Sequence, residues 1–443
     1  MVDSASEARR AAEVWLSHVP KPPPRPDGID WDVFISYRSL DRKWAFVLYD
    51  TLTEAGYKIF LDQYVLQAGV TLDATLEKHL SRSASAVLVW SRAAADSEWV
   101  HAEYGKIRNL KAKADRKERP PFHYVIAKLD TEDLPFLDGD KLFVPFHEYP
   151  DGPRGGELLR LIFGLVGRGL TTEAVKFISS LDEETRDVLN KARVARDLGH
   201  ADSLLDLANL VSPVLFATPQ PLSVIIDALI SIADVNKSPE RLDQALALLT
   251  VARERFPRSI RLRQLTGLAY RRKKQVRDAL EILKSLHVEG HRDPETMGML
   301  GASFMEEFRV SGRKIDLERS QDAYADAFSK TPSDSYVGIN AASKLAMLGR
   351  VEEARVLAET GVLPLVANAT SGDDYWTTVT LAEVELLRGH YPEAAKLYRQ
   401  AVVRHPAEQG SIASSREQVL ALFGPLKVPD ADQTAIVAAL TVE

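Results

Sequence analysis

Two hydrophobic patterns divide the chain. Between residues 29 and 170, short runs of consecutive apolar residues alternate with stretches in which apolar residues recur at three- and four-residue spacing. The runs are typical of strands buried on both faces of a sheet, and the spacing is typical of amphipathic helices. The predicted strands are 33–37, 57–61, 84–90, 122–129 and 141–146. The predicted helices are 42–55, 72–80, 99–110 and 157–166. Strands that alternate with helices of this length predict an α/β domain, a parallel sheet with helices on both faces.

Past about residue 170 the strand signals disappear, and the apolar spacing remains helical. A repeat becomes visible when small residues are aligned, because five of them stand 34, 41, 34 and 40 positions apart. We call these the anchor residues: Ala245, Ala279, Ser320, Ala354 and Ala394. A tetratricopeptide unit has 34 residues, so the spacing predicts an array of such units with insertions. A generic helical bundle in which the small residues coincide is the alternative.

Residues around the anchors follow the same repeat. Large or small apolar residues lie four positions on, at Leu249, Leu283, Tyr324, Ala358 and Tyr398, and prolines lie twelve positions on, at Pro257, Pro332 and Pro406. Gly349 and Gly389 are predicted to lie in turns between helices. The first helices of two units also match in part, as Gly267-x-Ala269-Tyr270 and Leu300-Gly301-x-x-Phe304. We therefore expect an all-helical tetratricopeptide-like domain over residues 171–443.

The N-terminal part differs from both domains. Residues 7–18 have the pattern of one short helix, and the run PKPPPRP at 20–26 interrupts it as a stiff polyproline II spacer. The first twenty residues contain acids and arginines but no apolar run of the length that an export signal needs. The expected domains are thus 1–28, an N-terminal helix and proline-rich linker, then 29–170 and 171–443.

Composition excludes several classes of protein. The 443 residues are 45% hydrophobic and carry a formal net charge of −7, so we expect no membrane span and no general attraction to nucleic acid. The absence of cysteine from the sequence excludes disulfides, thiolate nucleophiles and cysteine-ligated metals. Together with the N-terminus, it is consistent with a cytoplasmic protein.

Other chemical motifs are weak. The basic run at 106–119 lacks interleaved aromatic residues and is interpreted as a solvated helix end, so no nucleic-acid binding is expected. The histidines, among them His101, His147 and His291, show no metal-ligand spacing, and we expect no metal site. The sequence also contains neither a phosphate-binding G-x-x-x-x-G-K nor a G-x-S-x-G motif.

Candidate chemistry gathers after the first three predicted strands. Ligands of an open parallel sheet bind outside the carboxyl ends of the strands, near the topological switch point. The polar stretches there are Tyr37–Asp41 after the first strand, Asp62–Gly69 after the second and Ser97–Tyr104 beyond the third.

These stretches resemble the TIR (Toll/interleukin-1 receptor/resistance) domain family. The family's first-strand signature D-V-F-I-S-Y stands unbroken at 32–37, and F-L-D-x-x-x-L-x-x-G at 60–69 matches its BB loop. The stretch S-x-W-V-x-x-E at 97–103 resembles the W-x-x-x-E motif of TIR domains that cleave NAD⁺, including the animal axon-degeneration enzyme and bacterial defence proteins. The resemblance covers roughly 30–168 and implies a flavodoxin-like fold. The helical remainder resembles bacterial TIR–tetratricopeptide proteins and, more faintly, the TRAF-binding region of some stress kinases.

The resemblance implies the roles of the site residues. It implies Glu103 as the catalytic residue, Trp99 as a pocket residue, and Tyr37 and Arg38 as nucleotide contacts. In the BB loop it implies assembly or substrate contact for Asp62, Leu66, Gln67 and Gly69. Gln67 departs from the family pattern, because the animal enzyme has an acid there. NAD⁺ would be a substrate, and no cofactor is expected.

Ordinary roles for the same residues remain open. A glutamate on an amphipathic helix is most often solvated, a tryptophan is often core, and Arg38 has possible ion-pair partners in Asp41 and Asp62. Against this, cleavage of the nicotinamide–ribose bond passes through an oxocarbenium-like state that one nearby carboxylate stabilises. Trp99, four positions before Glu103, lies on the same face of a helix.

Two functions follow. The first is an NAD⁺ glycohydrolase that produces nicotinamide and ADP-ribose, or a cyclic isomer, and that is controlled by TIR–TIR assembly. Its repeats would sense an unidentified partner or ligand, and NAD⁺ depletion would serve bacterial antiphage defence. The second is a non-catalytic TIR–tetratricopeptide adaptor or scaffold, including one that interferes with host receptor signalling. The presence of both Trp99 and Glu103 favours the enzyme.

Overall fold

The computed structural model describes residues 13–38, 41–61, 72–95, 98–131, 143–147, 152–209, 218–367, 375–406 and 408–441. By its internal contacts the chain divides into two compact units, residues 1–233 with 238–269 and residues 234–237 with 270–443. The predicted domain boundaries at 28/29 and 170/171 stay predictions.

A parallel sheet forms the centre of the N-terminal part. Among the described residues its strands are β1 (Trp31–Ser36), β2 (Ile59–Leu61), β3 (Ser83–Trp90), β4 (His123–Lys128) and β5 (Val144–Pro145). They pair in the order β2-β1-β3-β4-β5, and each neighbouring pair is parallel. This is the flavodoxin-like order, so the predicted fold class is confirmed. The chain order reverses between β1 and β3, which makes their carboxyl ends the switch point.

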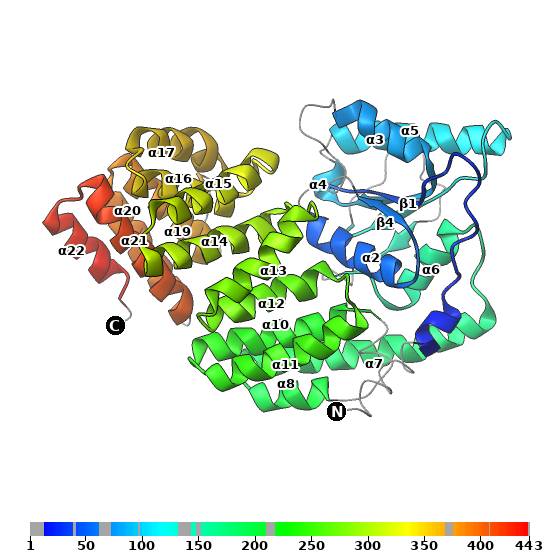
Figure 1. Cartoon of the computed structure of the whole chain (residues 1–443), viewed down its shortest axis with the longest axis horizontal. Coiled ribbons are helices and arrows are strands. Elements are labelled where there is room, and N and C mark those ends of the chain that lie inside the picture. The colour runs from blue at the N-terminus through cyan, green and yellow to red at the C-terminus, as the bar shows by residue number, and fades with distance from the viewer. Residues whose placement is uncertain are drawn as a thin grey trace. The chain divides into compact units, whose positions relative to one another are not determined.

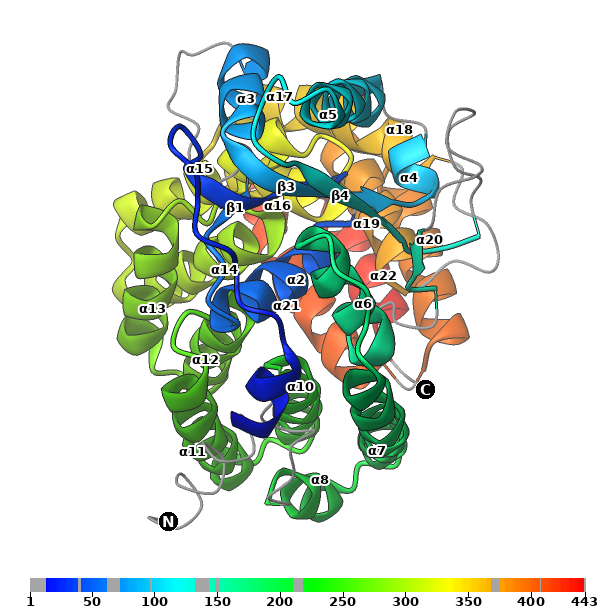
Figure 2. The ribbon, with the colours of Figure 1, turned by 90° about the vertical axis from the view of Figure 1, so that its right-hand side faces the viewer.

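Helices cover both faces of this sheet. In Figures 1 and 2, α3 (Leu72–Ser81) and α5 (Glu98–Asp115) lie on one face, and α2 (Arg42–Glu54) and α6 (Gly155–Leu165) lie on the other. The short helix α4 (Arg92–Ala95) follows β3. Phe34 and Phe60 from the strands pack with Ile107 of α5 in one buried cluster. The strands are apolar because both faces are covered.

The N-terminal segment packs against its neighbours. Residues 13–18 are helical, and the proline-rich residues 20–26 have no regular structure. The Pro20 carbonyl accepts a hydrogen bond from the Tyr57 hydroxyl (2.5 Å), and Arg25 forms an ion pair with the buried Asp32 (2.8 Å). The His18 ring also stacks on Phe177, with centroids 4.2 Å apart. The segment that was predicted as a spacer is therefore held by side-chain contacts at both of its ends.

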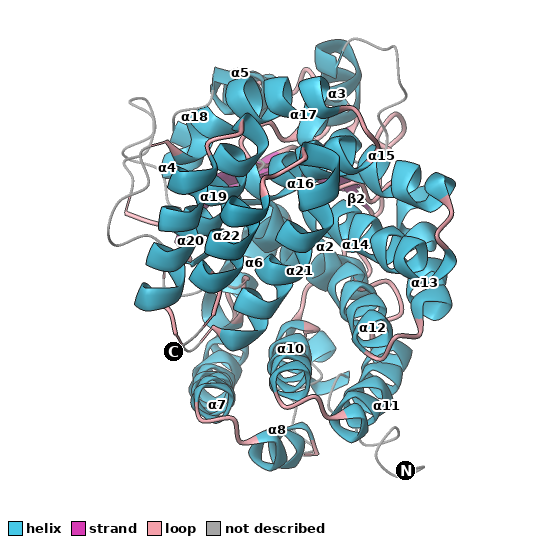
Figure 3. Cartoon of the chain, turned by 90° about the vertical axis from the view of Figure 1, so that its left-hand side faces the viewer, coloured by secondary structure: helices cyan, strands magenta, loops and turns pink. Residues whose placement is uncertain are grey.

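From residue 172 onward the described chain is helical, as predicted. The helices of the first unit are α7 (Thr172–Asp197), α8 (Ala201–Ala208), α10 (Gln220–Val235) and α11 (Pro239–Arg255), and α12 (Ile260–Arg272) crosses into the second unit. The second unit continues with α13 (Val276–Val288), α14 (Pro294–Ser311), α15 (Lys314–Lys330), α16 (Ser335–Met347), α17 (Val351–Leu357), a π-helical turn (Ala358–Val362), α18 (Leu363–Val366), α19 (Tyr375–Arg388), α20 (Tyr391–Arg404), α21 (Gln409–Leu426) and α22 (Asp430–Ala439). Figure 3 shows these helices of the second unit side by side.

The anchor residues explain the packing of the repeats. Each of the five has 0% of its surface exposed, and each lies on the second helix of a helical pair: α11, α13, α15, α17 and α20. Small side chains are required there because the neighbouring helix passes close by. The Ser320 hydroxyl, for example, donates to the Gly301 carbonyl on α14 (2.8 Å). Gly349 and Gly389 lie in the predicted turns with φ of +81° and +84°.

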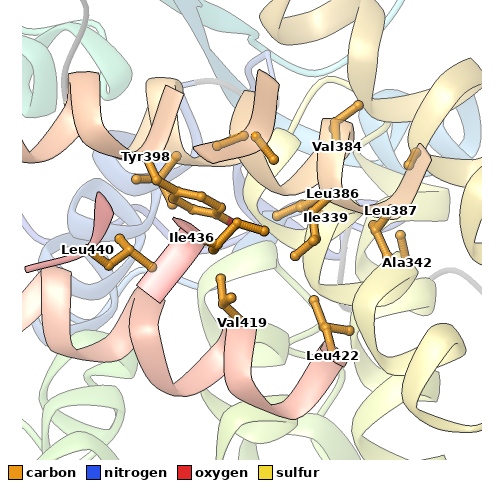
Figure 4. Close-up of a cluster of buried hydrophobic side chains, with 14 of the residues drawn as sticks. Ile339, Ala342, Val384, Leu386, Leu387, Tyr398, Val419, Leu422, Ile436 and Leu440 are labelled. Atoms are coloured by element: carbon orange, nitrogen blue, oxygen red, sulfur yellow. The ribbon is translucent and has the colours of Figure 1, made fainter. Parts of the chain in front are cut away.

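A large apolar cluster closes the C-terminal end of the second unit. It includes Tyr398 of α20, Val419 of α21 and Ile436 of α22, which come from three different helices. Figure 4 shows the Tyr398 ring beside Ile436, with Val419 below it. Across the described residues, no helix combines the length and apolar character that crossing a membrane requires.

Candidate functional site

A buried serine–glutamate pair lies at the carboxyl edge of the sheet. Ser36 is the last residue of β1, and Glu103 lies on α5 with 6% of its surface exposed. The Ser36 hydroxyl donates a hydrogen bond to Oε2 of Glu103. Because β1 borders the switch point, this pair places a carboxylate where ligands of such sheets bind. A hydrogen bond from a hydroxyl fixes the orientation of the carboxylate.

A second polar group stands at the same edge. The Ser91 hydroxyl, just after β3, donates to Oδ2 of Asp41 (2.7 Å), and the Ser91 oxygen accepts from the Ala94 backbone N–H (3.2 Å). Asp130, beyond β4, accepts from the Arg92 backbone N–H (2.8 Å). Burial and the charge of Asp130 raise the pKa of the Asp41 carboxyl, while the Ser91 hydrogen bond and the charge of Arg38 lower it. At this edge the charge of Asp130 therefore acts on the Asp41 carboxyl, whose pKa is raised overall.

Two family models match the chain. One describes a TIR domain and matches residues 33–159, and the other describes Tetratricopeptide Repeats-Sensor and matches residues 241–356. The chain carries a TIR domain followed by tetratricopeptide sensor repeats. The second match covers α11 to α16 and part of α17, where the sequence predicted the repeats.

Relatives and solved structures cover parts of the chain. Over 97 residues the chain is 34% identical to TMV resistance protein N of Nicotiana glutinosa. The matched stretch covers 21% of this chain but only 8% of that protein's length. A thermophilic TPR protein of Thermus thermophilus is 20% identical, with 44% of this chain and 99% of that one covered at a TM-score of 0.35. The APC/C hetero-tetramer Cut9-Hcn1 is 12% identical; the match covers 83% of this chain and 74% of that one, at a TM-score of 0.27.

The structure brings together some of the predicted site residues of the TIR domain. Glu103, Tyr37 and Arg38 all lie at the carboxyl edge, where Tyr37 is buried and Arg38 is half-buried directly after β1. The Arg38 carbonyl accepts from the Asp41 backbone N–H (2.8 Å), which closes a turn before α2. Trp99 lies on α5 as predicted, but its side chain is outside the described residues. The BB-loop residues Asp62, Leu66, Gln67 and Gly69 also lie outside them.

The basic run of the TIR domain has mostly structural partners. Lys106 pairs with Glu77 (3.3 Å), and Lys111 pairs with Asp115 (2.5 Å). Arg119 donates to the Ser83 carbonyl (2.9 Å) and lies over the Phe122 ring, 4.7 Å from its centroid. These contacts agree with a helix end that closes on the sheet.

The histidines singled out in the sequence do not gather. His101 is exposed and contacts the Ala95 carbonyl through Nε2 (2.8 Å), and its ring lies at right angles to that of Trp90, with centroids 5.5 Å apart. His291 is buried in the repeats, and His147 follows β5. In the part of the chain that the structure describes, no group of three or more histidine, aspartate or glutamate side chains is arranged to hold a metal ion.

Sequence reasoning missed the partners of the site. Ser36 is part of the D-V-F-I-S-Y signature, and its position as the last residue of a strand was the available signal for a role at the edge. Asp32, the aspartate of the same signature, lies at the amino end of β1, away from the Ser36–Glu103 pair. It accepts from the Lys58 backbone N–H (2.7 Å) and pairs with Arg25, so it fixes β2 and the N-terminal segment.

Proposed function

We propose that the TIR domain is an NAD⁺ glycohydrolase in which Glu103 is the catalytic residue. The observation that supports this most is the position of Glu103: it lies on α5 at the carboxyl edge beside the switch point, and a hydroxyl from β1 orients its carboxylate. One oriented carboxylate in a largely water-excluded position is the minimal machinery for stabilising a ribosyl cation.

The reaction needs no strong general acid. The nicotinamide ring of NAD⁺ is cationic, so when the C1′–N bond breaks, the electron pair of the bond goes to the ring nitrogen and neutral nicotinamide leaves. The ribosyl centre takes up positive charge, which the Glu103 carboxylate stabilises electrostatically. Water then attacks C1′ and loses a proton, which gives ADP-ribose; capture by the adenine ring gives a cyclic isomer instead. Tyr37, Arg38 and Trp99 are proposed to contact the nucleotide.

Control of this activity is proposed to come from assembly. TIR–TIR contacts through the BB loop would bring neighbouring domains together, and the sensor repeats would respond to a partner or ligand, since such arrays present extended surfaces. The TIR match to a protein named for resistance to TMV supports a role in immune defence. NAD⁺ depletion in an infected bacterial cell is the proposed output.

One observation favours the adaptor as the second candidate. Glu103 is 6% exposed and bonded to Ser36, so the same pair is compatible with a purely structural role at the edge of the sheet. In that case the TIR domain would act through binding other TIR domains. Catalysis requires in addition that the carboxylate becomes accessible to the ribose.

The two candidates differ in NAD⁺ consumption by the full chain. Wild type and Glu103→Ala are assayed at low and high protein concentration, with the products separated by chromatography. The enzyme predicts nicotinamide with ADP-ribose or its cyclic isomer, a steep dependence on protein concentration, and no products from the variant. No NAD⁺ loss at any concentration supports the adaptor, and equal loss in wild type and variant contradicts Glu103 as the catalytic residue.

A further inference from the structure

The repeats contact the TIR domain through two carboxyl groups of α2, and both partners belong to the first compact unit. Oδ2 of Asp50 accepts hydrogen bonds from the Ser259 hydroxyl and from the Ile260 backbone N–H, both at 3.0 Å. One helical turn later, Glu54 pairs with Arg255 of α11 (3.5 Å). Asp50 is 2% exposed, so this contact is shielded from water.

The contact uses the start of a repeat helix. Ser259 precedes α12, and its oxygen also accepts from the Leu262 backbone N–H (3.3 Å). The first N–H groups of a helix have no partner within the helix, and Oδ2 of the Asp50 carboxyl group accepts from one of them. A side chain of the TIR domain thereby completes the N-terminus of α12.

The same helix of the TIR domain begins at the candidate site. α2 starts at Arg42, directly after Asp41 and the turn that follows β1. Asp50 lies about two turns further along this helix. Between the two positions Trp44 packs edge-on against Phe146, and Leu48 is fully buried. α2 is therefore a rigid element with the site at one end and the repeat contact at the other.

The repeat side of the contact is also continuous. α12 begins at the contact, and the division between the compact units falls inside this helix, after Ala269. The sensor family match spans both sides of that division. A change in the remaining repeats thus has a covalent, helical path to the residues that hold α2.

We propose that Asp50 and Glu54 form a latch with Ser259, Ile260 and Arg255, and that the closed latch restrains the Glu103 site through α2. This regulation rests on the proposed glycohydrolase. The closed latch coexists in the structure with a Glu103 that is shielded and bonded to Ser36. Opening of the latch frees α2 and the turn after β1, and exposes the carboxylate to the ribose.

The experiment compares full-length variants for NAD⁺ cleavage and for amide hydrogen exchange. Asp50→Ala opens the latch, and Glu254→Gln is the matched control, because Glu254 is an exposed carboxylate on α11 beside Arg255. The expected result for Asp50→Ala is faster exchange in α2 and at Ser36–Arg38, and about a fivefold or larger rise in cleavage rate at a low protein concentration. Glu254→Gln is expected to match wild type in both.

A charge-reversal cycle keeps the test decisive if Asp50→Ala does not fold. Glu54→Arg and Arg255→Glu each place like charges together, and the double variant restores opposite charges. Each single variant is expected to raise exchange at Ser36–Arg38 and cleavage, and the double variant is expected to return both toward wild type. Single variants that loosen α11 and α12 but leave exchange at Ser36–Arg38 unchanged would overturn the latch.

Failure of the function and failure of the latch give different results. If wild type cleaves NAD⁺ and the latch variants cleave it at the same rate, the latch is wrong and the glycohydrolase stands. If no variant cleaves NAD⁺ at any concentration, the glycohydrolase is wrong, and exchange at Ser36–Arg38 alone decides whether α2 transmits the contact.

Discussion

The hydroxyl of Ser36 donates a hydrogen bond to the carboxylate of Glu103, although the two residues lie 67 positions apart in the sequence. β1 and α5 meet at the carboxyl edge of the sheet because α5 follows the carboxyl end of β3, which lies beside that of its parallel neighbour β1. The pair combines a signature that describes the first strand with a motif that describes a helix. Neither motif by itself predicts that Ser36 and Glu103 are hydrogen-bonded.

Removal of this hydroxyl is expected to impair cleavage. Ser36→Ala should lower the NAD⁺ cleavage rate roughly 10- to 100-fold, because a hydrogen bond to a charged group is worth about 1.5–3 kcal/mol. Ser83→Ala is the control: Ser83 is a buried serine at the other end of the sheet that donates to the His79 carbonyl (2.8 Å). Equal losses in both variants would contradict a positioning role for Ser36.

The Asp50 carboxyl should make stability depend on pH. Burial raises its pKa from 3.8 to about 8, and Glu54 adds to this, against the hydrogen bonds from Ser259, Ile260 and Arg261. Arg255 and Arg258 face the neighbouring Glu54. Between these two pKa values the folded chain binds more protons than the unfolded chain, so the stabilisation is complete below about pH 4 and is lost as the pH rises to about 8.

Thermal unfolding of wild type and Asp50→Asn from pH 5 to pH 9 measures this dependence. The asparagine has no proton to lose, so the unfolding midpoint of wild type should fall relative to that of the variant as the pH rises, and the difference should level off above about pH 8. Glu254→Gln should follow wild type. Parallel curves for wild type and Asp50→Asn would show that Asp50 does not titrate in this range.

Much of the fold was predictable from local pattern. The apolar run of β3 is typical of a strand buried on both faces, and the three- and four-residue spacing in α2 is typical of a helix with one buried face. The ends of both elements were therefore predicted within one or two residues. The anchor residues were predictable because in every repeat the neighbouring helix passes close by and leaves room only for a small side chain. The contact of Asp50 was not, since its partner Ser259 lies 209 positions away and a lone aspartate on an amphipathic helix has no distinguishing pattern.

Close packing at Gly301 gives a test of the repeats. A Cβ built there would lie 2.7 Å from the Tyr324 ring. Gly301→Ala should therefore destabilise the chain by about 1–3 kcal/mol, as overpacking does. Gly410→Ala is the control, because nothing lies within 4 Å of its Cβ position and alanine favours a helix. Midpoints of chemical unfolding compare the two; a Gly301→Ala variant as stable as Gly410→Ala would contradict the packing.

The Tyr398 ring and its hydroxyl make opposite contributions. The side chain is fully buried at the position four residues after the anchor Ala394, and its hydroxyl has no hydrogen-bond partner among the described residues. Tyr398→Phe should leave the free energy of unfolding unchanged or raise it by up to about 1 kcal/mol, while Tyr398→Ala should lower it by about 3–5 kcal/mol. A large loss in Tyr398→Phe would instead indicate a buried water on the hydroxyl.

The Glu103 carboxylate is proposed to catalyse the cleavage of NAD⁺. The most direct measurement is nicotinamide release by full-length wild type and Glu103→Gln at the same high protein concentration, with unfolding midpoints recorded for both. The glutamine keeps the shape and the contact with Ser36 but not the charge. Wild type should release nicotinamide, and a variant that is still folded should release it about 10²-fold or more slowly. Equal release by the two folded proteins would contradict this role of Glu103.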